Sequence, residues 1–262
     1  MARITYRSHG GSRAYWQARW DDVDADTGKL NLKRYPGKFA EDTLRRLTVS
    51  GPILEAGCGA GRVVRFYHQQ GRDIIGMDFI PTAVQKIKQA VPAIPLTAAD
   101  VEKLPFADEC LSCVLAFGLY HNLEQGIADA VRETRRVLKT GGHLCAAMRL
   151  DNIQNRMIDW LTDRKQSGGE RRFHKINHTQ QELKDVFSRN GFAIEDIYFV
   201  ENMPFVYKFR PFRAASHKTF DETKGRAEGY RLSLLGNAVQ KTLIGLFLPA
   251  FCNAAVIIAR AK

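Results

Sequence analysis

Short apolar runs alternate with amphipathic segments along the amino-terminal half of the chain. A run such as residues 111–117 has few polar positions, which is typical of a strand buried on both faces of a parallel sheet. The segments between the runs repeat apolar residues at helical spacing. The alternation of strands and helices predicts an α/β fold with a mostly parallel sheet. The predicted strands are one that begins at Ile53, then residues 73–78, 94–98, 111–117 and 143–148, and the predicted helices are residues 35–47, 62–70, 81–90 and 127–138.

The carboxy-terminal half departs from this alternation. Residues 149–177 are polar and rich in arginine and lysine, and we expect an insertion over the ligand-binding edge of the sheet. A helix is predicted at residues 179–190, where Thr179 and Glu182 match a capping box. A strand follows at residues 192–200, and residues 202–235 are basic and aromatic.

An uncharged stretch near the end of the chain approaches the length that crosses a membrane. Residues 242–259 carry no charged side chain, and about 20 apolar residues are needed to span a bilayer. Pro249 interrupts the stretch, so we predict a short apolar helix followed by a buried strand at residues 253–259.

The first 43 residues are predicted to form a helical cap. Residues 1–12 are expected to be flexible, and the helix after them carries Trp16 and Trp20 on one face. These aromatic residues either pack the cap onto the domain or form a lid over a small-molecule pocket. The rest, residues 44–262, is predicted to be one ligand-binding domain with substrate-covering insertions at residues 149–177 and 202–250.

Three glycines follow the first predicted strand at every second position: Glu55-Ala56-Gly57-Cys58-Gly59-Ala60-Gly61. Glycine lets the backbone turn sharply and approach a ligand closely. The amide groups of the next helix are available for an anion or nucleotide. A dinucleotide fingerprint needs Gly or Ala where Arg62 stands, which disfavours a nicotinamide oxidoreductase.

Asp78 ends the second predicted strand at the spacing of a ribose-binding carboxylate. An aspartate at a strand end also serves as a helix N-cap. Because the glycine turn precedes it, we favour ribose binding.

The composition restricts the partners and the compartment. The formal net charge of the 262 residues is +11, which indicates an anionic partner or, equally, a solvated basic surface. The five cysteines are odd in number and irregularly spaced, which favours a reducing, cytoplasmic compartment. The basic, polar amino terminus does not resemble a secretory signal. The seven histidines are scattered, and no metal site is predicted.

Taken together, these motifs resemble the class I S-adenosylmethionine (SAM)-dependent methyltransferases, the superfamily that includes the ubiquinone and menaquinone methyltransferases. The resemblance rests on the glycine turn, Asp78, Asp100 before Leu104-Pro105-Phe106, and Gly141-Gly142 after a helix. It implies a Rossmann-like, doubly wound, seven-stranded sheet of order 3-2-1-4-5-7-6 with an antiparallel last strand. It also implies SAM as cofactor and S-adenosylhomocysteine as product.

The resemblance assigns roles residue by residue. The glycines would pass under the methionine and ribose of SAM, Phe79 would pack on the adenine, and the Phe117 carbonyl would meet the ammonium group. The cofactor-binding residues that it implies are Glu55, Gly57, Cys58, Gly59, Gly61, Asp78, Phe79, Asp100, Val101 and Phe117.

Methyl transfer from SAM is an in-line displacement, so positioning supplies much of the catalysis. A base is needed only when the acceptor must lose a proton, and His121 is the best-placed candidate. Tyr120 is a weaker catalytic candidate, and Tyr15 and His174 are candidate substrate contacts.

We expect a small-molecule or lipid-like acceptor, methylated on O, N or C, and the apolar carboxy-terminal stretch favours peripheral contact with an anionic membrane surface. An RNA methyltransferase, or a non-catalytic SAM-binding or partner-binding module, are the alternatives.

Overall fold

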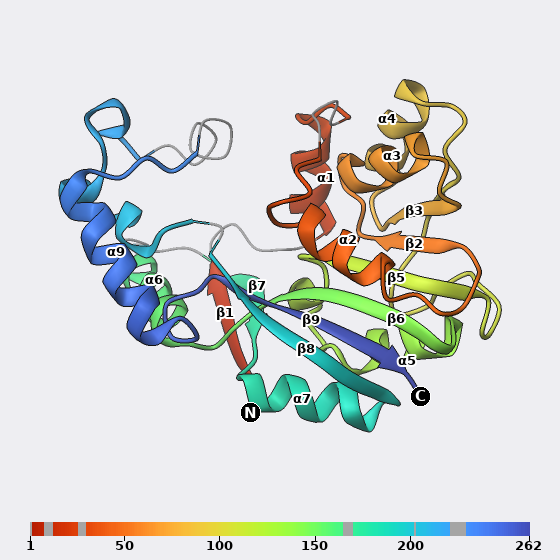
Figure 1. The fold of residues 1–262 in the computed structure, drawn as a ribbon. Coiled ribbons are helices and arrows are strands. Elements are labelled where there is room, and N and C mark those ends of the chain that lie inside the picture. Colours follow the sequence, from red (N-terminus) through yellow and green to blue (C-terminus); the bar gives the residue numbers. More distant parts are fainter. Residues whose placement is uncertain (1, 8–12, 26–29, 165–169, 202, 221–228) are drawn as a thin grey trace.

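A seven-stranded sheet forms the centre of the computed structural model, which describes residues 2–7, 13–25, 30–164, 170–201, 203–220 and 229–262 (Figure 1). The last strand in sequence, β9, is antiparallel to both of its neighbours. Numbered by sequence, the core strands follow the order 3-2-1-4-5-7-6, which the resemblance implied. Across the sheet the strands are β4 (Leu96–Ala98), β3 (Ile74–Asp78), β2 (Ile53–Ala56), β5 (Leu111–Phe117), β6 (Leu138–Arg149), β9 (Ala254–Ala261) and β8 (Phe192–Val200).

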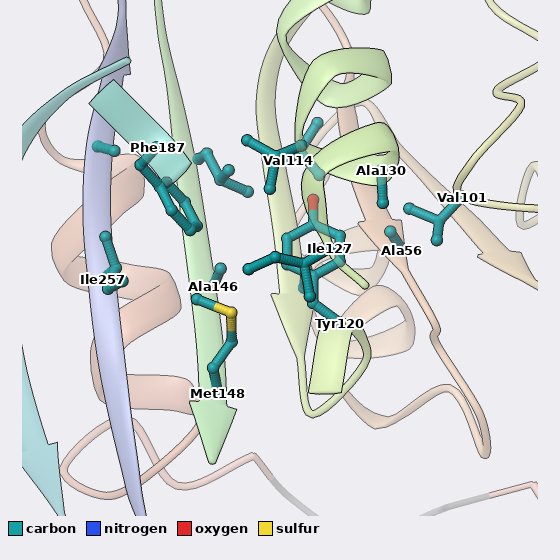
Figure 2. Packing of buried hydrophobic residues seen from close by; sticks show 14 of the residues in the cluster. Ala56, Val101, Val114, Tyr120, Ile127, Ala130, Ala146, Met148, Phe187 and Ile257 are labelled. Carbon is teal, nitrogen blue, oxygen red and sulfur yellow. The ribbon is translucent and has the colours of Figure 1, made fainter. Parts of the chain in front are cut away.

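Helices cover both faces of this sheet. Along β5, Val114 and Ala116 face one core cluster, whereas Cys113 and Leu115 face the other, as strand geometry requires. The first cluster packs under α5 (Ala128–Val137) and α7 (Gln180–Arg189), and Figure 2 shows part of it. The second packs under α2 (Gly37–Leu44), α3 (Arg62–Gln69) and α4 (Pro81–Ala90).

Most predicted elements occur within one or two residues of their predicted bounds. The capping box at Thr179 is formed, with both reciprocal hydrogen bonds to Glu182. The strand predicted at residues 143–148 is longer, because β6 already begins at Leu138, which pairs with Leu111.

A second, two-stranded sheet joins the amino terminus to the middle of the chain. Strand β1 (Arg3–Arg7) pairs antiparallel with β7 (Arg172–Asn177). The prediction of a flexible segment is therefore wrong for residues 3–7. Pairing with β7 orders them, and this partner lies far away in sequence, where a local pattern cannot reveal it. Residues 1 and 8–12 of the segment predicted to be flexible lie outside the described residues. The amino-terminal cap accordingly contains a strand besides α1 (Arg13–Asp21) and α2.

The two predicted insertions contain regular structure. Residues 149–177 hold α6 (Ile153–Asp163) and β7. The described part of residues 202–250 holds three short 3-10 turns, η2 (Phe205–Lys208), η3 (Arg210–Phe212) and η4 (Ala215–His217), and helix α9 (Leu234–Phe247). None of the described helices is long and apolar enough to cross a bilayer.

Candidate active site

The glycine turn links β2 to α3 at the carboxyl edge of the sheet. Gly57, Gly59 and Gly61 have φ angles of 73°, 52° and 82°, a left-handed region that favours glycine. The amide groups of Gly57 and Cys58 both donate to the Met77 carbonyl, at 2.8 and 2.9 Å. The turn is thereby attached to β3, the strand that carries Asp78.

Close packing around the turn also requires glycine. A Cβ atom on Gly59 would lie 2.7 Å from two ring carbons of Trp20, and one on Gly61 would lie 2.8 Å from the side chain of Ile87. Both distances are shorter than real Cβ contacts. A side chain at either position would force the neighbouring side chain or the turn itself to shift.

Two buried carboxyl groups accept backbone hydrogen bonds in and beside the turn. Glu55 accepts a hydrogen bond from the Val64 amide at 2.6 Å, in the first turn of α3. Asp78 accepts from the Gly59 amide at 2.9 Å and from the Ile80 amide at 3.0 Å. Burial raises the pKa of Glu55 to about 8 and also raises the pKa of Asp78. Asp78 therefore shapes both the glycine turn and the entry to α4.

The predicted adenine contacts lie at the same edge, beside Asp78. The Phe79 ring is exposed, and the Arg13 guanidinium carbon lies 4.7 Å from its centre. The Ala99 amide donates to the Asp78 carbonyl at 3.1 Å, which brings the following segment alongside. There the Asp100 carboxylate accepts from the Glu102 amide, and Val101 is buried in the core. A strand-end carboxylate beside an exposed aromatic ring fits an adenosine.

Helix α1 lies across this part of the site. Lys86 on α4 donates to the carbonyls of Trp20, Asp21 and Val23, at 2.9, 2.7 and 3.0 Å. These bonds hold the Trp20 ring against Gly59. The sequence allowed two interpretations of the aromatic residues of α1: packing of the amino-terminal cap onto the domain, or a lid over a small-molecule pocket. Trp20 was not among the predicted cofactor-binding residues.

The end of β5 provides the next part of the site. Phe117 is half-buried, and its ring meets the ring of Tyr35 edge-on at 5.7 Å. Leu119 lies against the glycine turn, where a Cβ on Gly57 would be 3.2 Å from its side chain. Tyr35 and Leu119 were not predicted, because no local motif marks them.

Tyr120 is the weaker of the two catalytic candidates. Its side chain is fully buried in the core (Figure 2), and its hydroxyl group bonds the Thr134 hydroxyl at 2.7 Å. The hydroxyl therefore faces α5, on the side of the core, which does not favour a catalytic role, and that role stays a prediction.

His121 lies in a short turn, η1 (Tyr120–Asn122), directly after β5. Its Nδ1 atom is buried and has no hydrogen-bond partner among the described residues. Burial lowers the pKa of His121 well below its ordinary value, and the neighbouring charges of Lys175 and Arg149 lower it further. The imidazole is therefore neutral at physiological pH.

A cluster of basic side chains stands beside His121, where β6 ends and the β1–β7 ribbon crosses. Asp159 receives hydrogen bonds from three guanidinium groups, those of Arg3, Arg7 and Arg149, at 2.9, 3.1 and 2.7 Å. The Arg149 Nε atom is buried and has no partner among the described residues. Arg3 also donates to Asp151 at 2.6 Å, so three arginines and the nearby Lys175 stand beside two carboxylates, and the local charge is positive.

The two predicted substrate contacts lie in different parts of the fold. His174 lies on β7 within this basic cluster, and burial together with Arg7, Lys175 and Arg149 lowers its pKa to about 3. Tyr15 lies on α1, edge-on to Trp16 at 5.2 Å. Their contact with a substrate stays a prediction.

Two further kinds of chemistry, nucleophilic attack by Cys58 and metal binding, find little support among the described residues. Burial raises the pKa of the Cys58 thiol well above its ordinary value, and the Glu55 and Asp78 carboxyl groups raise it further, so the thiol is a poor nucleophile. Among the described residues, no group of three or more metal-ligating side chains could hold a metal ion.

The sheet order, the glycine turn and the strand-end Asp78 define a Rossmann-like fold of the class I methyltransferase type. Residues 54–146 match a family model described as a methyltransferase domain. The chain accordingly contains a class I SAM-dependent methyltransferase domain, and the cofactor of this family is SAM.

Relatives support the same assignment. The chain is 33% identical over 118 residues to an uncharacterized methyltransferase of Bacillus subtilis, covering 42% of this chain and 50% of that protein. It is 29% identical over 103 residues to the malonyl-[acyl-carrier protein] O-methyltransferase of Pectobacterium atrosepticum, covering 38% of this chain and 39% of that protein. The chain thus spans half or less of the length of these relatives.

A solved structure resembles nearly the whole chain. It is a geranyl diphosphate C-methyltransferase from Streptomyces coelicolor A3(2), with a TM-score of 0.59 and 13% identity, covering 95% of this chain and 96% of that one. At this identity the likeness concerns the fold alone.

Proposed function

We propose that this protein transfers the methyl group of SAM to a small-molecule or lipid-like acceptor that carries an acidic group. The observation that carries the proposal is the juxtaposition of two sites at one sheet edge. Asp78 and the glycine turn stand at the carboxyl ends of β2 and β3, and the basic cluster around Arg149 stands at the end of β6. In open α/β sheets, ligands bind at this edge.

The residues of the chain would divide the work between binding and orientation. Asp78 would accept hydrogen bonds from the ribose, Phe79 would stack on the adenine, and Trp20 would exclude water from above the glycine turn. SAM supplies an electrophilic methyl group on a sulfonium. The reaction then requires mainly that the acceptor atom is held in line with that group.

The basic cluster supports an anionic acceptor. Arginine and lysine side chains bind carboxylates and phosphates through charge-assisted hydrogen bonds. Here Arg3, Arg7 and Arg149 donate to the Asp159 carboxylate, Arg3 also donates to Asp151, and Lys175 and His174 lie close by. Neutral His121 would accept a proton from an acceptor that must lose one. The names of two similar proteins also include acceptors with acidic groups, malonyl and geranyl diphosphate.

The first experiment is isothermal titration calorimetry with SAM, S-adenosylhomocysteine and NADH. We expect micromolar binding of the first two compounds and none of NADH. Asp78→Ala should abolish binding, because it removes both the ribose acceptor and the partner of the Gly59 amide. Asp73→Ala is the matched control, since Asp73 is an exposed residue just before the same strand. NADH binding without SAM binding would contradict the proposal.

The acceptor is tested by turnover. Radiolabelled SAM is offered with lipid extracts, with pairs of acids and their neutral amides, and with RNA. We expect methylation of acids and not of their amides. Methylation of RNA that weakens steeply with added salt would favour the RNA alternative. SAM binding without turnover on any acceptor would favour the non-catalytic module.

A further inference from the structure

Exposed apolar side chains are concentrated on the outward sides of two helices, α6 and α9. Seven of the thirteen exposed large hydrophobic side chains among the described residues lie on α6 and α9, so the surface of these two helices is unusually apolar. We call it the outer apolar face. It consists of Ile153, Met157, Trp160, Leu234, Leu235, Leu246 and Phe247.

The two helices belong to one unit at the end of the sheet (Figure 1). Ile158 of α6 packs in one hydrophobic cluster with Val239 and Leu243 of α9. The start of α6 is bonded to the segment after α9, where the Gln154 amide donates to the Ala250 carbonyl at 3.0 Å. Because the inner sides of the two helices pack together, their outer sides keep a constant position relative to each other.

Helix α6 turns an apolar stripe outward. Ile153, Met157 and Trp160 recur at helical spacing and are exposed, and the Trp160 side chain is 51% exposed. The Arg164 guanidinium carbon lies 3.8 Å from the centre of the Trp160 ring, and Arg156, exposed on the same side, is paired with Asp151. An amphipathic helix with Trp and Arg on one face suits the boundary between lipid headgroups and acyl chains.

Helix α9 extends this surface. Leu234 and Leu246 are 92% and 67% exposed, near opposite ends of the helix. Lys241 is the only charged residue of α9, and it is exposed. Arg210 and Lys218, in the segment that precedes α9, are exposed as well. Of the acidic residues near the α6 stripe in sequence, Asp151 and Asp159 have buried side chains that pair with arginines, and Asp163 is half-buried.

We propose that the outer apolar face docks the protein onto an anionic lipid surface. Apolar side chains would enter the headgroup region while arginine and lysine meet the lipid phosphates. A second copy of the chain is a poorer occupant, because a two-fold interface would bring these like charges together. The proposal is independent of methyl transfer and concerns only where the enzyme works.

The test is flotation of the full chain with vesicles of phosphatidylcholine alone and of phosphatidylcholine mixed equally with phosphatidylglycerol. We expect binding to the mixed vesicles only, weakened by salt. Leu234→Ser combined with Leu246→Ser should reduce partitioning by about 100-fold or more. Arg164→Gln combined with Lys241→Gln should reduce it by roughly 30-fold.

Matched variants elsewhere control for hydrophobicity and charge. Val23→Ser with Leu32→Ser removes two exposed apolar residues outside the face, and Lys184→Gln with Arg189→Gln removes two exposed charges on α7. Both should bind vesicles as the wild type does. Binding of S-adenosylhomocysteine, measured on every variant, verifies the fold. Failure to bind mixed vesicles, equal effects of the controls, or a dimer that the Leu234→Ser and Leu246→Ser substitutions dissociate would each overturn the proposal.

Discussion

Glu55 is a carboxyl group buried between a strand and the helix after it. Its pKa is raised to about 8 because burial disfavours the charged form. In the unfolded chain the pKa of a glutamate is about 4.3. Between these values the unfolded state has lost the proton and the native state still holds it, so a rise in pH favours unfolding.

The free energy of unfolding of the ligand-free protein should reveal this coupling. Relative to Glu55→Gln, the wild type should lose stability as pH rises from about 4.5 to about 8, at up to about 1.4 kcal/mol per pH unit. Glutamine keeps an oxygen for the Val64 amide but does not titrate. Denaturant unfolding at several pH values measures the difference, with exposed Glu109→Gln as control. Parallel profiles for wild type and Glu55→Gln would contradict the expectation.

The pKa of His121 is lowered in the folded protein, whereas that of Glu55 is raised. Burial, Lys175, Arg149, His174 and His178 all lower its pKa, so it stays neutral and able to accept a proton below its ordinary pKa of about 6.5. If His121 is the base, the rate of methyl transfer should remain level between neutral pH and about pH 6.

His121→Asn should lower that rate by about 100-fold or more. The measurement is a pH–rate profile of both proteins, with His68→Asn on α3 as control. A wild-type inflection near the ordinary histidine pKa, absent from His121→Asn, would show that the imidazole titrates normally. An unchanged rate in His121→Asn would exclude it as the base.

At the scale of elements, the attachment of α1 to α4 decides how the cofactor side of the site is covered. Lys86 and Lys88 lie on the same helix and both donate to backbone carbonyls. Only Lys86 reaches α1, whereas Lys88 bonds the Ile94 carbonyl at 3.0 Å. The two lysines therefore form a matched pair.

Lys86→Met should speed the dissociation of S-adenosylhomocysteine by about tenfold, since hydrogen bonds from a charged group contribute about 1.5–3 kcal/mol. Lys88→Met should leave this rate unchanged. Stopped-flow displacement measures both. Equal rates in the two variants would mean that α1 does not retain the ligand.

The amino-terminal strand shows why some elements escape prediction. Residues 3–7 have a weak local pattern, and their structure depends on pairs such as Arg3 with Asn177 and on the ion pair of Arg3 with Asp159. A strand of this kind is stabilised by its partner strand, and a pattern read from neighbouring residues does not include that partner. Helix α7, in contrast, has its capping box and periodicity within its own sequence.

At the scale of the whole molecule, one core joins the two halves of the chain. Phe187 of α7 is fully buried in the same cluster as Val114 and Ala130, which belong to the matched methyltransferase segment. Its ring packs against Phe192, with ring centres 5.9 Å apart. The carboxy-terminal half should therefore unfold together with the amino-terminal half.

Phe187→Ala should lower the free energy of unfolding by about 3–5 kcal/mol and keep a single transition. Phe247→Ala, at an exposed position of α9, should have little effect. Circular dichroism and tryptophan fluorescence during denaturation measure the change. Two separate transitions, with only one shifted by Phe187→Ala, would contradict a shared core.

The sequence by itself determined the alternating strands and helices, the glycine turn and the place of Asp78. These features depend on periodicity and on short-range backbone chemistry, which neighbouring residues carry. The tertiary structure alone decided that Trp20 covers Gly59, that three arginines meet at Asp159, and that Tyr120 faces the core. It also decided which sides of α6 and α9 stay exposed. Each of these depends on contacts between segments distant in the chain, so side-chain packing in three dimensions determines them.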